Sequence, residues 1–196
     1  PTLGSEHACL VVAGIGFDAA LVAVTSPALK ARIKWGAYAL AALENLRTPR
    51  MELSLGLVGA PDDDGPPGPP RPGLPPSQER LVARCLLIAN GGRLPAGIVL
   101  IPGARMDDGL LDVAAIDTVA GLAGWTSLAR QVLPPFAATY SNPSRALGRV
   151  RLRRGTAVSV HLAEPALVQV DGELLAPTRA LRVRMDAGAL LVRCPE

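Results

Sequence analysis

Short apolar runs separated by turn residues fill the chain from Leu147 onward, and this spacing constrains the fold more than any other feature. Gly, Pro and Asp stand between the runs. Several strands at such spacing indicate a sandwich or barrel of short strands rather than alternating strands and helices. The runs cover residues 147–153, 156–162, 166–170, 173–176, 180–185 and 189–193.

The earlier part of the chain combines predicted strands with two predicted helices. Apolar residues recur at helical spacing in Ser26–Arg47, with Ser26 as N-cap and proline at the next position. A second helix is predicted for Val119–Leu133. Residues 59–78 are rich in Pro, Gly and Asp without periodicity, which predicts a flexible loop rather than a domain linker. Further strands are predicted at His7–Ala13, Arg50–Val58, Leu81–Ala89, Ile98–Ile101 and Leu111–Ile116.

The composition excludes some classes of protein. Basic residues exceed acidic ones only slightly, 20 against 17, so the net charge of +3 gives no reason to expect nucleic-acid binding. The three cysteines are widely spaced in apolar runs, which is typical of small buried side chains in a reducing cytoplasm. No apolar run approaches the roughly 18 residues of a membrane-spanning helix, so we expect a soluble, cytoplasmic protein. The chain begins at Pro1 without an initiator Met, which suggests a fragment or a processed chain.

The segment Gly14-Ile15-Gly16-Phe17-Asp18-Ala19 formally matches a dinucleotide-binding fingerprint. That fingerprint needs an acidic residue at the end of a second strand about 20 positions further on. Here that distance falls inside the predicted helix Ser26–Arg47. A tight glycine turn is therefore favoured, and Asp18 then serves as a cap for the helix that follows.

Three carboxylates surround a glycine in Asp107-Asp108-Gly109-Leu110-Leu111-Asp112. Carboxylates and turn carbonyls are hard oxygen ligands, which suit Mg²⁺ or Ca²⁺. The alternating acidic positions and distal Glu of an EF-hand loop are missing. A simple turn that opens the strand at Leu111 explains the same residues, so the pattern leaves both interpretations open.

The segment Val170-Asp171-Gly172-Glu173-Leu174 predicts a β-hairpin, because Asp-Gly between two apolar alternating runs favours a tight two-residue turn. A glutamate at the first position of the return strand is then held rigidly. Such a carboxylate acts as a general base when it lies within hydrogen-bond reach of a substrate hydroxyl.

Taken together and in this order, the motifs resemble the C-terminal domain of the diacylglycerol kinase and sphingosine kinase superfamily of lipid kinases. The similarity covers nearly the whole chain. The segments that carry the resemblance are Gly14–Ala19, Lys34-Trp35-Gly36-Ala37-Tyr38, Asn90-Gly91-Gly92, Pro102-Gly103-Ala104, Asp107–Val113, Val170–Glu173 and a closing strand that ends at Pro195.

The resemblance implies a mainly β fold with some α: a two-sheet antiparallel β-sandwich with helices packed at its edge, over residues 1–196. It implies transfer of the γ-phosphate of ATP to the hydroxyl of a diacylglycerol or sphingoid-type lipid. Glu173 is then the general base and Asp18 a contact to the lipid head group. Mg²⁺ is expected on the Asp108 side chain and the backbone carbonyls of Arg105 and Leu110.

The ATP-binding domain of such kinases carries a Gly-Gly-Asp-Gly-Thr loop, which does not occur in this sequence. We therefore expect the N-terminal domain to be absent from the chain, and the chain alone to be inactive. The alternative is a non-catalytic β-sandwich module that binds a lipid or a protein.

An arginine cluster precedes and enters the first of the C-terminal runs. Such charges are most simply a solvated face or protection of a strand edge against aggregation. They also suit peripheral contact with an anionic membrane, where each basic residue adds about 1 kcal/mol. The cluster consists of Arg145, Arg149, Arg151, Arg153 and Arg154.

Overall fold

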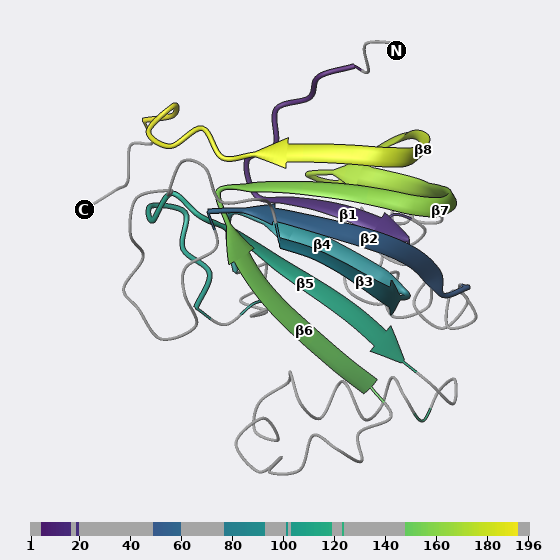
Figure 1. Ribbon diagram of the computed structural model, residues 1–196. Coiled ribbons are helices and arrows are strands. Elements are labelled where there is room, and N and C mark those ends of the chain that lie inside the picture. Colours follow the sequence, from purple (N-terminus) through teal and green to yellow (C-terminus); the bar gives the residue numbers. More distant parts are fainter. Residues whose placement is uncertain are drawn as a thin grey trace.

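The computed structural model describes residues 5–16, 19, 49–59, 77–92, 101, 103–118, 123 and 148–191. Every complete secondary-structure element within these ranges is a strand, and the eight strands form one antiparallel sheet (Figure 1). The strands are β1 (Val12–Gly16), β2 (Met51–Val58), β3 (Ser77–Ala83), β4 (Cys85–Ala89), β5 (Leu111–Thr118), β6 (Gly148–Gly155), β7 (Ala157–Val170) and β8 (Glu173–Arg184).

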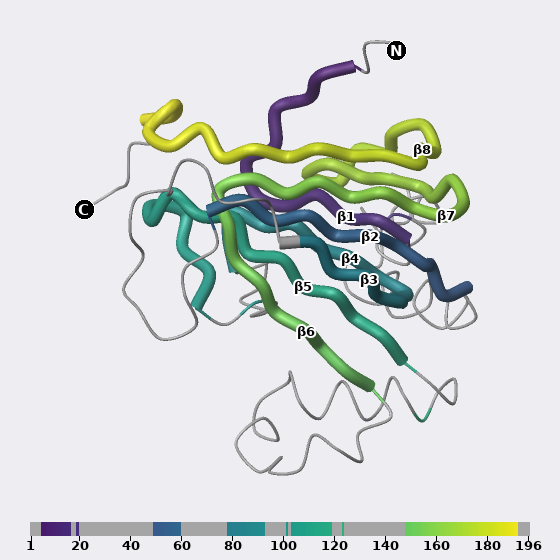
Figure 2. The backbone as a smooth tube through the Cα atoms, in the orientation of Figure 1, coloured from purple at the N-terminus to yellow at the C-terminus, as the bar shows by residue number. Residues whose placement is uncertain are grey.

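The long strand β7 holds the sheet together. Its residues Ala157–Leu162 pair with β2, whereas Val168–Val170 pair with β1. The strand order is therefore β3-β2-β7-β1-β4-β5-β6, and β8 pairs with β7 along most of its length. Figure 2 traces the backbone through this curled arrangement, from β8 at one side of the sheet to β6 at the other.

This topology corrects the expected fold. A two-sheet sandwich was wrong, because β7 joins the strands of both expected sheets into one hydrogen-bonded sheet that curls. Helices packed at its edge were also part of that expectation, and the described residues contain no such element. The segments predicted as helices, Ser26–Arg47 and Val119–Leu133, lie outside the described residues apart from Ala123.

The main core lies on the face that the curl encloses. Side chains alternate between the two faces of a strand, so every second residue of β2 enters this core: Leu53, Leu55 and Leu57. In the same core they are joined by Ile88 of β4 and Val113 of β5. The opposite face carries a smaller apolar cluster around Leu87 and Ala114. Branched aliphatic residues and alanine thus build most of both clusters, together with the buried Cys85 in the smaller one.

The single strand predicted at Leu81–Ala89 divides at Arg84 into β3 and β4. The Arg84 backbone N–H donates to the carbonyl of Ile116 at 2.9 Å, and its Nε donates to the carbonyl of Thr118 at 2.8 Å. Because β3 pairs with β2 whereas β4 pairs with β1 and β5, this break lets consecutive residues join distant parts of the curled sheet.

The predicted breaks near Pro165 and Pro177 do not end the strands. The runs 156–162 and 166–170 form the continuous β7, and 173–176 and 180–185 form β8. The ladder is instead irregular between His161 and Val168. Proline cannot donate a ladder hydrogen bond, so an irregular stretch tolerates it where a regular central strand would not. The run predicted at 189–193 is outside any strand as far as Leu191, the last described residue.

Gly14 and Ile15 lie inside β1 rather than in the predicted turn, and the predicted strand at His7–Ala13 begins only at Val12. Both neighbours of β1 run antiparallel to it, which also excludes the parallel arrangement of a dinucleotide-binding fold. Gly16 ends the strand with φ +80°. A Cβ there would lie 2.6 Å from the Arg84 carbonyl oxygen, so this position requires glycine.

Candidate functional site

The hairpin predicted at Val170–Leu174 is confirmed. Val170 pairs with Glu173, and the two residues between them have positive φ, +48° for Asp171 and +88° for Gly172. Such angles are those of the tight turn that suits the twist of paired strands, and Asp-Gly adopts them readily. The Gly172 N–H also donates to the side-chain oxygen of the buried Gln169 at 2.7 Å, which fixes the turn further.

The Asp171 carboxylate binds the backbone that leads into β1. It accepts three consecutive N–H groups, from Leu10 at 2.6 Å and from Val11 and Val12 at 2.9 Å each. The Asp171 N–H in turn donates to the Val12 carbonyl at 2.9 Å. Although partial burial alone would raise the pKa of Asp171, these backbone donors hold it below its ordinary value. Asp171 therefore anchors the turn to the start of β1.

Glu173 follows this anchored turn as the first residue of β8. Its side chain is exposed and forms no hydrogen bond or ion pair with any of the described residues. The turn thus fixes the backbone of Glu173 while leaving its carboxylate free. A carboxylate with these two properties is suited to accept a proton from a bound ligand.

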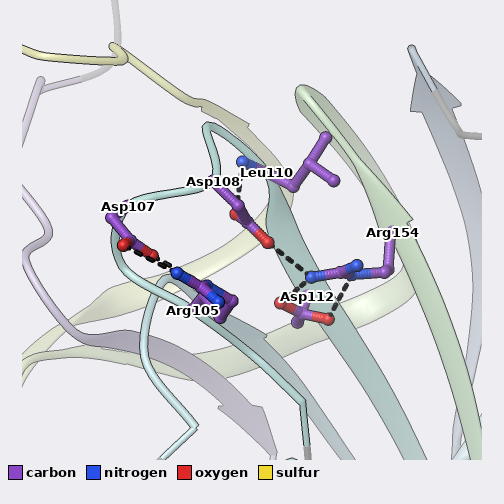
Figure 3. A network of polar contacts seen from close by, with 6 residues as sticks. All are labelled: Arg105, Asp107, Asp108, Leu110, Asp112 and Arg154. Carbon is purple, nitrogen blue, oxygen red and sulfur yellow. Dashed lines mark hydrogen bonds and ion pairs between the residues drawn. The ribbon is translucent and has the colours of Figure 1, made fainter. Parts of the chain in front are cut away.

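The Asp108 and Asp112 carboxylates share one guanidinium (Figure 3). The Arg154 Nε donates to Asp112 at 2.8 Å, and its Nη2 donates to Asp108 at 2.6 Å. The other oxygen of Asp108 accepts the Leu110 N–H at 3.0 Å. Only 7% of the Asp112 side chain is exposed, and this burial raises the pKa of Asp112 despite the guanidinium beside it.

The expected magnesium ligands fit a cation only in part. Both Asp108 oxygens already accept a hydrogen bond, one of them from a positive charge. Asp107 forms a bidentate pair with the exposed Arg105 (Figure 3). Among the described residues, no group of three or more acidic, histidine or cysteine side chains is arranged to hold a metal. A cation at Asp108 must therefore compete with Arg154.

One row of paired residues across the sheet connects the hairpin at Asp171 with the strand that follows the Asp108 loop. The Asp171 N–H bonds to Val12, which pairs with Ala89, and Ala89 pairs with Asp112 opposite Arg154. Adjacent strands lie about 4.8 Å apart, so three spacings separate the strands of Asp171 and Asp112 by roughly 14 Å. The hairpin that holds Glu173 and the Asp108 loop therefore belong to the same region of the molecule, without direct contact.

Asn90 is a further polar residue in this region that sequence reasoning did not single out for chemistry. Its Nδ2 donates to the Leu10 carbonyl at 3.1 Å, while its Oδ1 is buried without a hydrogen-bond partner. The only signal in the sequence was its place in Asn90-Gly91-Gly92. The other expected ligand contact, Asp18, lies outside the described residues.

The β6 arginines divide between the two faces of the sheet. Arg149, Arg151 and Arg153 stand opposite Asp117, Ala115 and Val113, so they share the face of the main core. Arg154 stands opposite Asp112 on the other face. Arg145 lies outside the described residues. The cluster therefore does not form one uniform basic surface.

Comparison with known proteins agrees with this curled antiparallel domain. The profile of the YegS C-terminal NAD kinase beta sandwich-like domain matches residues 9–194, and the chain belongs to this family. Two proteins from Pseudomonas aeruginosa strains, each described as "Probable lipid kinase YegS-like", are 31% identical over 180 residues. The match covers 92% of this chain and 51% of each relative. The chain thus spans about half the length of these relatives.

Solved structures share the fold. A Bacillus anthracis protein inferred to be a diacylglycerol kinase superposes with a TM-score of 0.58 at 15% identity, covering 92% of this chain and 50% of that one. A diacylglycerol kinase from the same organism gives 0.52 at 20% identity with the same coverage. These solved structures show a shared fold, and the profile match over residues 9–194 places the chain in the YegS C-terminal domain family. Within its described part, no helix is long and apolar enough to cross a membrane.

Proposed function

We propose that this domain supplies the catalytic base of an ATP-dependent lipid kinase and that Glu173 is that base. The observation that supports this proposal is the free carboxylate of Glu173 beside a turn that Asp171 anchors by three backbone hydrogen bonds. The names of the Pseudomonas aeruginosa relatives and of the Bacillus anthracis structures support the class of reaction.

In the proposed reaction, the Glu173 carboxylate takes the proton from a hydroxyl of a diacylglycerol or sphingoid-type lipid. The lipid oxygen then forms a bond to the γ-phosphorus of ATP, and the bond from that phosphorus to the bridging oxygen breaks to release ADP. Phosphoryl transfer depends mainly on positioning and charge neutralisation, so one rigidly placed base is a sufficient contribution from this side of the cleft.

ATP is bound mainly by a separate domain in this proposal, one with a Gly-Gly-Asp-Gly-Thr loop, and residues 1–196 form the lipid-facing domain. The chain alone is therefore inactive, because it has no such loop to hold the ATP phosphates. With radiolabelled ATP and mixed lipids, we expect only background incorporation. Turnover above that of a Glu173→Ala control would contradict the proposal that a separate domain binds ATP.

Magnesium in this proposal is held by the Asp108 side chain with the carbonyls of Arg105 and Leu110, partly through water. Hard oxygen ligands suit this ion, but Arg154 already pairs with Asp108, so binding is weak and serves structure more than chemistry. A bound ion would supply positive charge beside Asp107, Asp108 and Asp112, whose carboxylates repel one another. Asp18 is retained as the proposed contact to the lipid head group.

We further propose peripheral contact with anionic membrane through the basic residues of β6. Arg149, Arg151 and Arg153 share one face, where three positive charges meet the single carboxylate of Glu79, whereas Arg154 pairs with two carboxylates and adds no free charge. Liposome co-sedimentation should require anionic lipid and weaken with salt. Sedimentation that is independent of both conditions would exclude this contact.

The catalytic proposal is tested by lipid phosphorylation with the full-length enzyme carrying Glu173→Gln. This change keeps shape and hydrogen-bonding capacity but removes the proton acceptor, so we expect kcat to fall at least about a hundredfold. The matched control is Glu164→Gln, an exposed glutamate of β7 that pairs with Arg179 at 2.8 Å and should leave the rate unchanged. Retained activity in Glu173→Gln would overturn the assignment.

A further inference from the structure

The curl of the sheet brings its two end strands together along a seam. β3 and β6 stand at opposite ends of the strand order, yet Arg153 of β6 bonds to Glu79 of β3 at 3.1 and 3.2 Å. Arg151 reaches the same carboxylate at 3.4 Å. The seam is therefore closed by side chains rather than by a hydrogen-bonded ladder, which leaves space between the strands.

A pocket of about 310 Å³ opens at this seam, and arginine dominates its lining. One carboxylate, that of Asp117, lies among the lining residues and is already taken by Arg50 through both of its oxygens. The four arginines of the lining are Arg50, Arg80, Arg149 and Arg151.

The pocket has an excess of positive charge. With Arg153 at its border, five guanidiniums stand in or beside it against the two carboxylates of Asp117 and Glu79. The side chains of Arg80 and Arg149 form no hydrogen bond or ion pair with any residue that the structure describes. Like charges gathered at one pocket repel each other, and a bound anion would relieve that repulsion.

We propose that this seam pocket binds a phosphate group. Guanidinium presents a planar fork of N–H donors that matches phosphate oxygens in pairs. A phosphomonoester carries a charge of about −1.5 to −2 near neutral pH, which offsets the excess charge better than one carboxylate does. Arg80 and Arg149, which pair with no described residue, and the half-exposed Arg151 present donors to solvent at this pocket. This site is separate from the proposed base Glu173 and does not depend on kinase activity.

The test is calorimetric titration of the 196-residue chain with inorganic phosphate, and with acetate for comparison. Changing Arg149 and Arg151 together to Gln should weaken phosphate binding about tenfold or more, because charge-assisted bidentate contacts are lost. The matched control changes Arg182 and Arg184 to Gln on β8. Arg182 and Arg184 are also two residues apart, and their change to Gln removes the same charge. Like β6, β8 has a single neighbouring strand. Equal weakening in both variants, or equal affinity for acetate, would overturn the proposal.

A second variant keeps the proposal testable if the double substitution disturbs folding. Asp117→Asn releases Arg50 from its carboxylate and raises the positive charge of the pocket, so phosphate affinity should rise severalfold. Unchanged or weaker binding would contradict the assignment.

Vesicles distinguish the two sources of the phosphate group. If the group belongs to a lipid, vesicles of phosphatidate in phosphatidylcholine should bind the chain, and inorganic phosphate should compete. If it is soluble, inorganic phosphate alone should bind. Absence of both interactions would exclude the site.

Discussion

Two Asp-Gly turns lie in the same region of the sheet, and their carboxylates have different partners. Asp171 accepts three backbone N–H groups, whereas Asp108 shares Arg154 with Asp112. Both turns place their glycine at positive φ, +88° for Gly172 and +73° for Gly109. The dipeptide explains the local backbone in both cases, and the neighbouring strands determine what each carboxylate does.

The difference has a consequence for chemistry. At the first turn, Asp171 makes the hydrogen bonds that hold the turn, and Glu173 pairs with none of the residues that the structure describes. At the second turn, Asp108 and Asp112 both pair with the single guanidinium of Arg154, which offsets one of their two negative charges. We infer that the hairpin of Glu173 presents a reactive group and that the Asp108 loop is mainly structural.

The largest expected effect on stability comes from Arg154→Met. This change leaves the buried Asp112 without its cation, so the free energy of unfolding should fall by about 1–3 kcal/mol. For a domain of this size each kcal/mol lowers the melting temperature by about 2–4 °C. The control is Arg153→Met, whose exposed pair with Glu79 should contribute less than about 1 kcal/mol. An equal or larger loss in the control would refute the structural role of Arg154.

Asp171→Asn should lower the free energy of unfolding by about 1–2 kcal/mol near neutral pH, because the charge that accepts three N–H groups is lost. Asparagine tolerates the positive φ of this turn, so backbone strain adds little. Asp186→Asn, a change at an exposed aspartate after β8, serves as control in thermal melts. Equal melting temperatures for Asp171→Asn and the parent chain would contradict the anchoring role.

The stabilisation that Asp171 provides should depend on pH. Folding lowers the pKa of Asp171, so its contribution is complete above the unfolded value of about 4 and is lost as pH falls through the folded value. The difference in unfolding free energy between parent and Asp171→Asn should therefore shrink in urea titrations as the pH falls from about 5 toward 2. A difference that stays constant across this range would mean that the negative charge is not the cause.

The smallest expected effect is that of magnesium on the Asp108 loop. Millimolar Mg²⁺ should raise the melting temperature of the parent chain slightly and leave Asp108→Asn unchanged. Because Arg154 competes for the same oxygen, the rise should be larger in Arg154→Met. A rise of the same size in the parent chain and Asp108→Asn would show that Mg²⁺ does not bind at Asp108 and that the segment forms only a turn.

The sequence predicts best what depends on near neighbours. Alternating residues and the Asp-Gly turn identified the strands at 111–116 and 173–176 and the hairpin itself. The single curled sheet was not predictable, because it depends on β7 pairing with both β1 and β2. Pro165 and Pro177 were interpreted as strand ends, because the local sequence does not reveal that the ladder between β7 and β8 is irregular there.

At the candidate site, too, the long-range contacts could not be predicted from the local sequence. The partners of Asp171 lie 159 to 161 residues earlier in the chain, so no local pattern reveals its anchoring role. Arg154 looks equivalent to its basic neighbours until the register of β5 and β6 places it opposite Asp112. Glu173 was predicted as the base from the resemblance to lipid kinases, and that role remains a prediction.

The most direct test compares Glu173→Gln with Asp171→Asn in the full-length enzyme, with kcat and melting temperature measured for both variants. Glu173→Gln should lose at least about a hundredfold in kcat at an unchanged melting temperature, because it removes a proton acceptor that none of the described residues contacts through a hydrogen bond or ion pair. Asp171→Asn should lower the melting temperature by about 2–8 °C. A Glu173→Gln enzyme that keeps its kcat, or that loses stability as Asp171→Asn does, would contradict the assignment of Glu173 as a free base on an anchored turn.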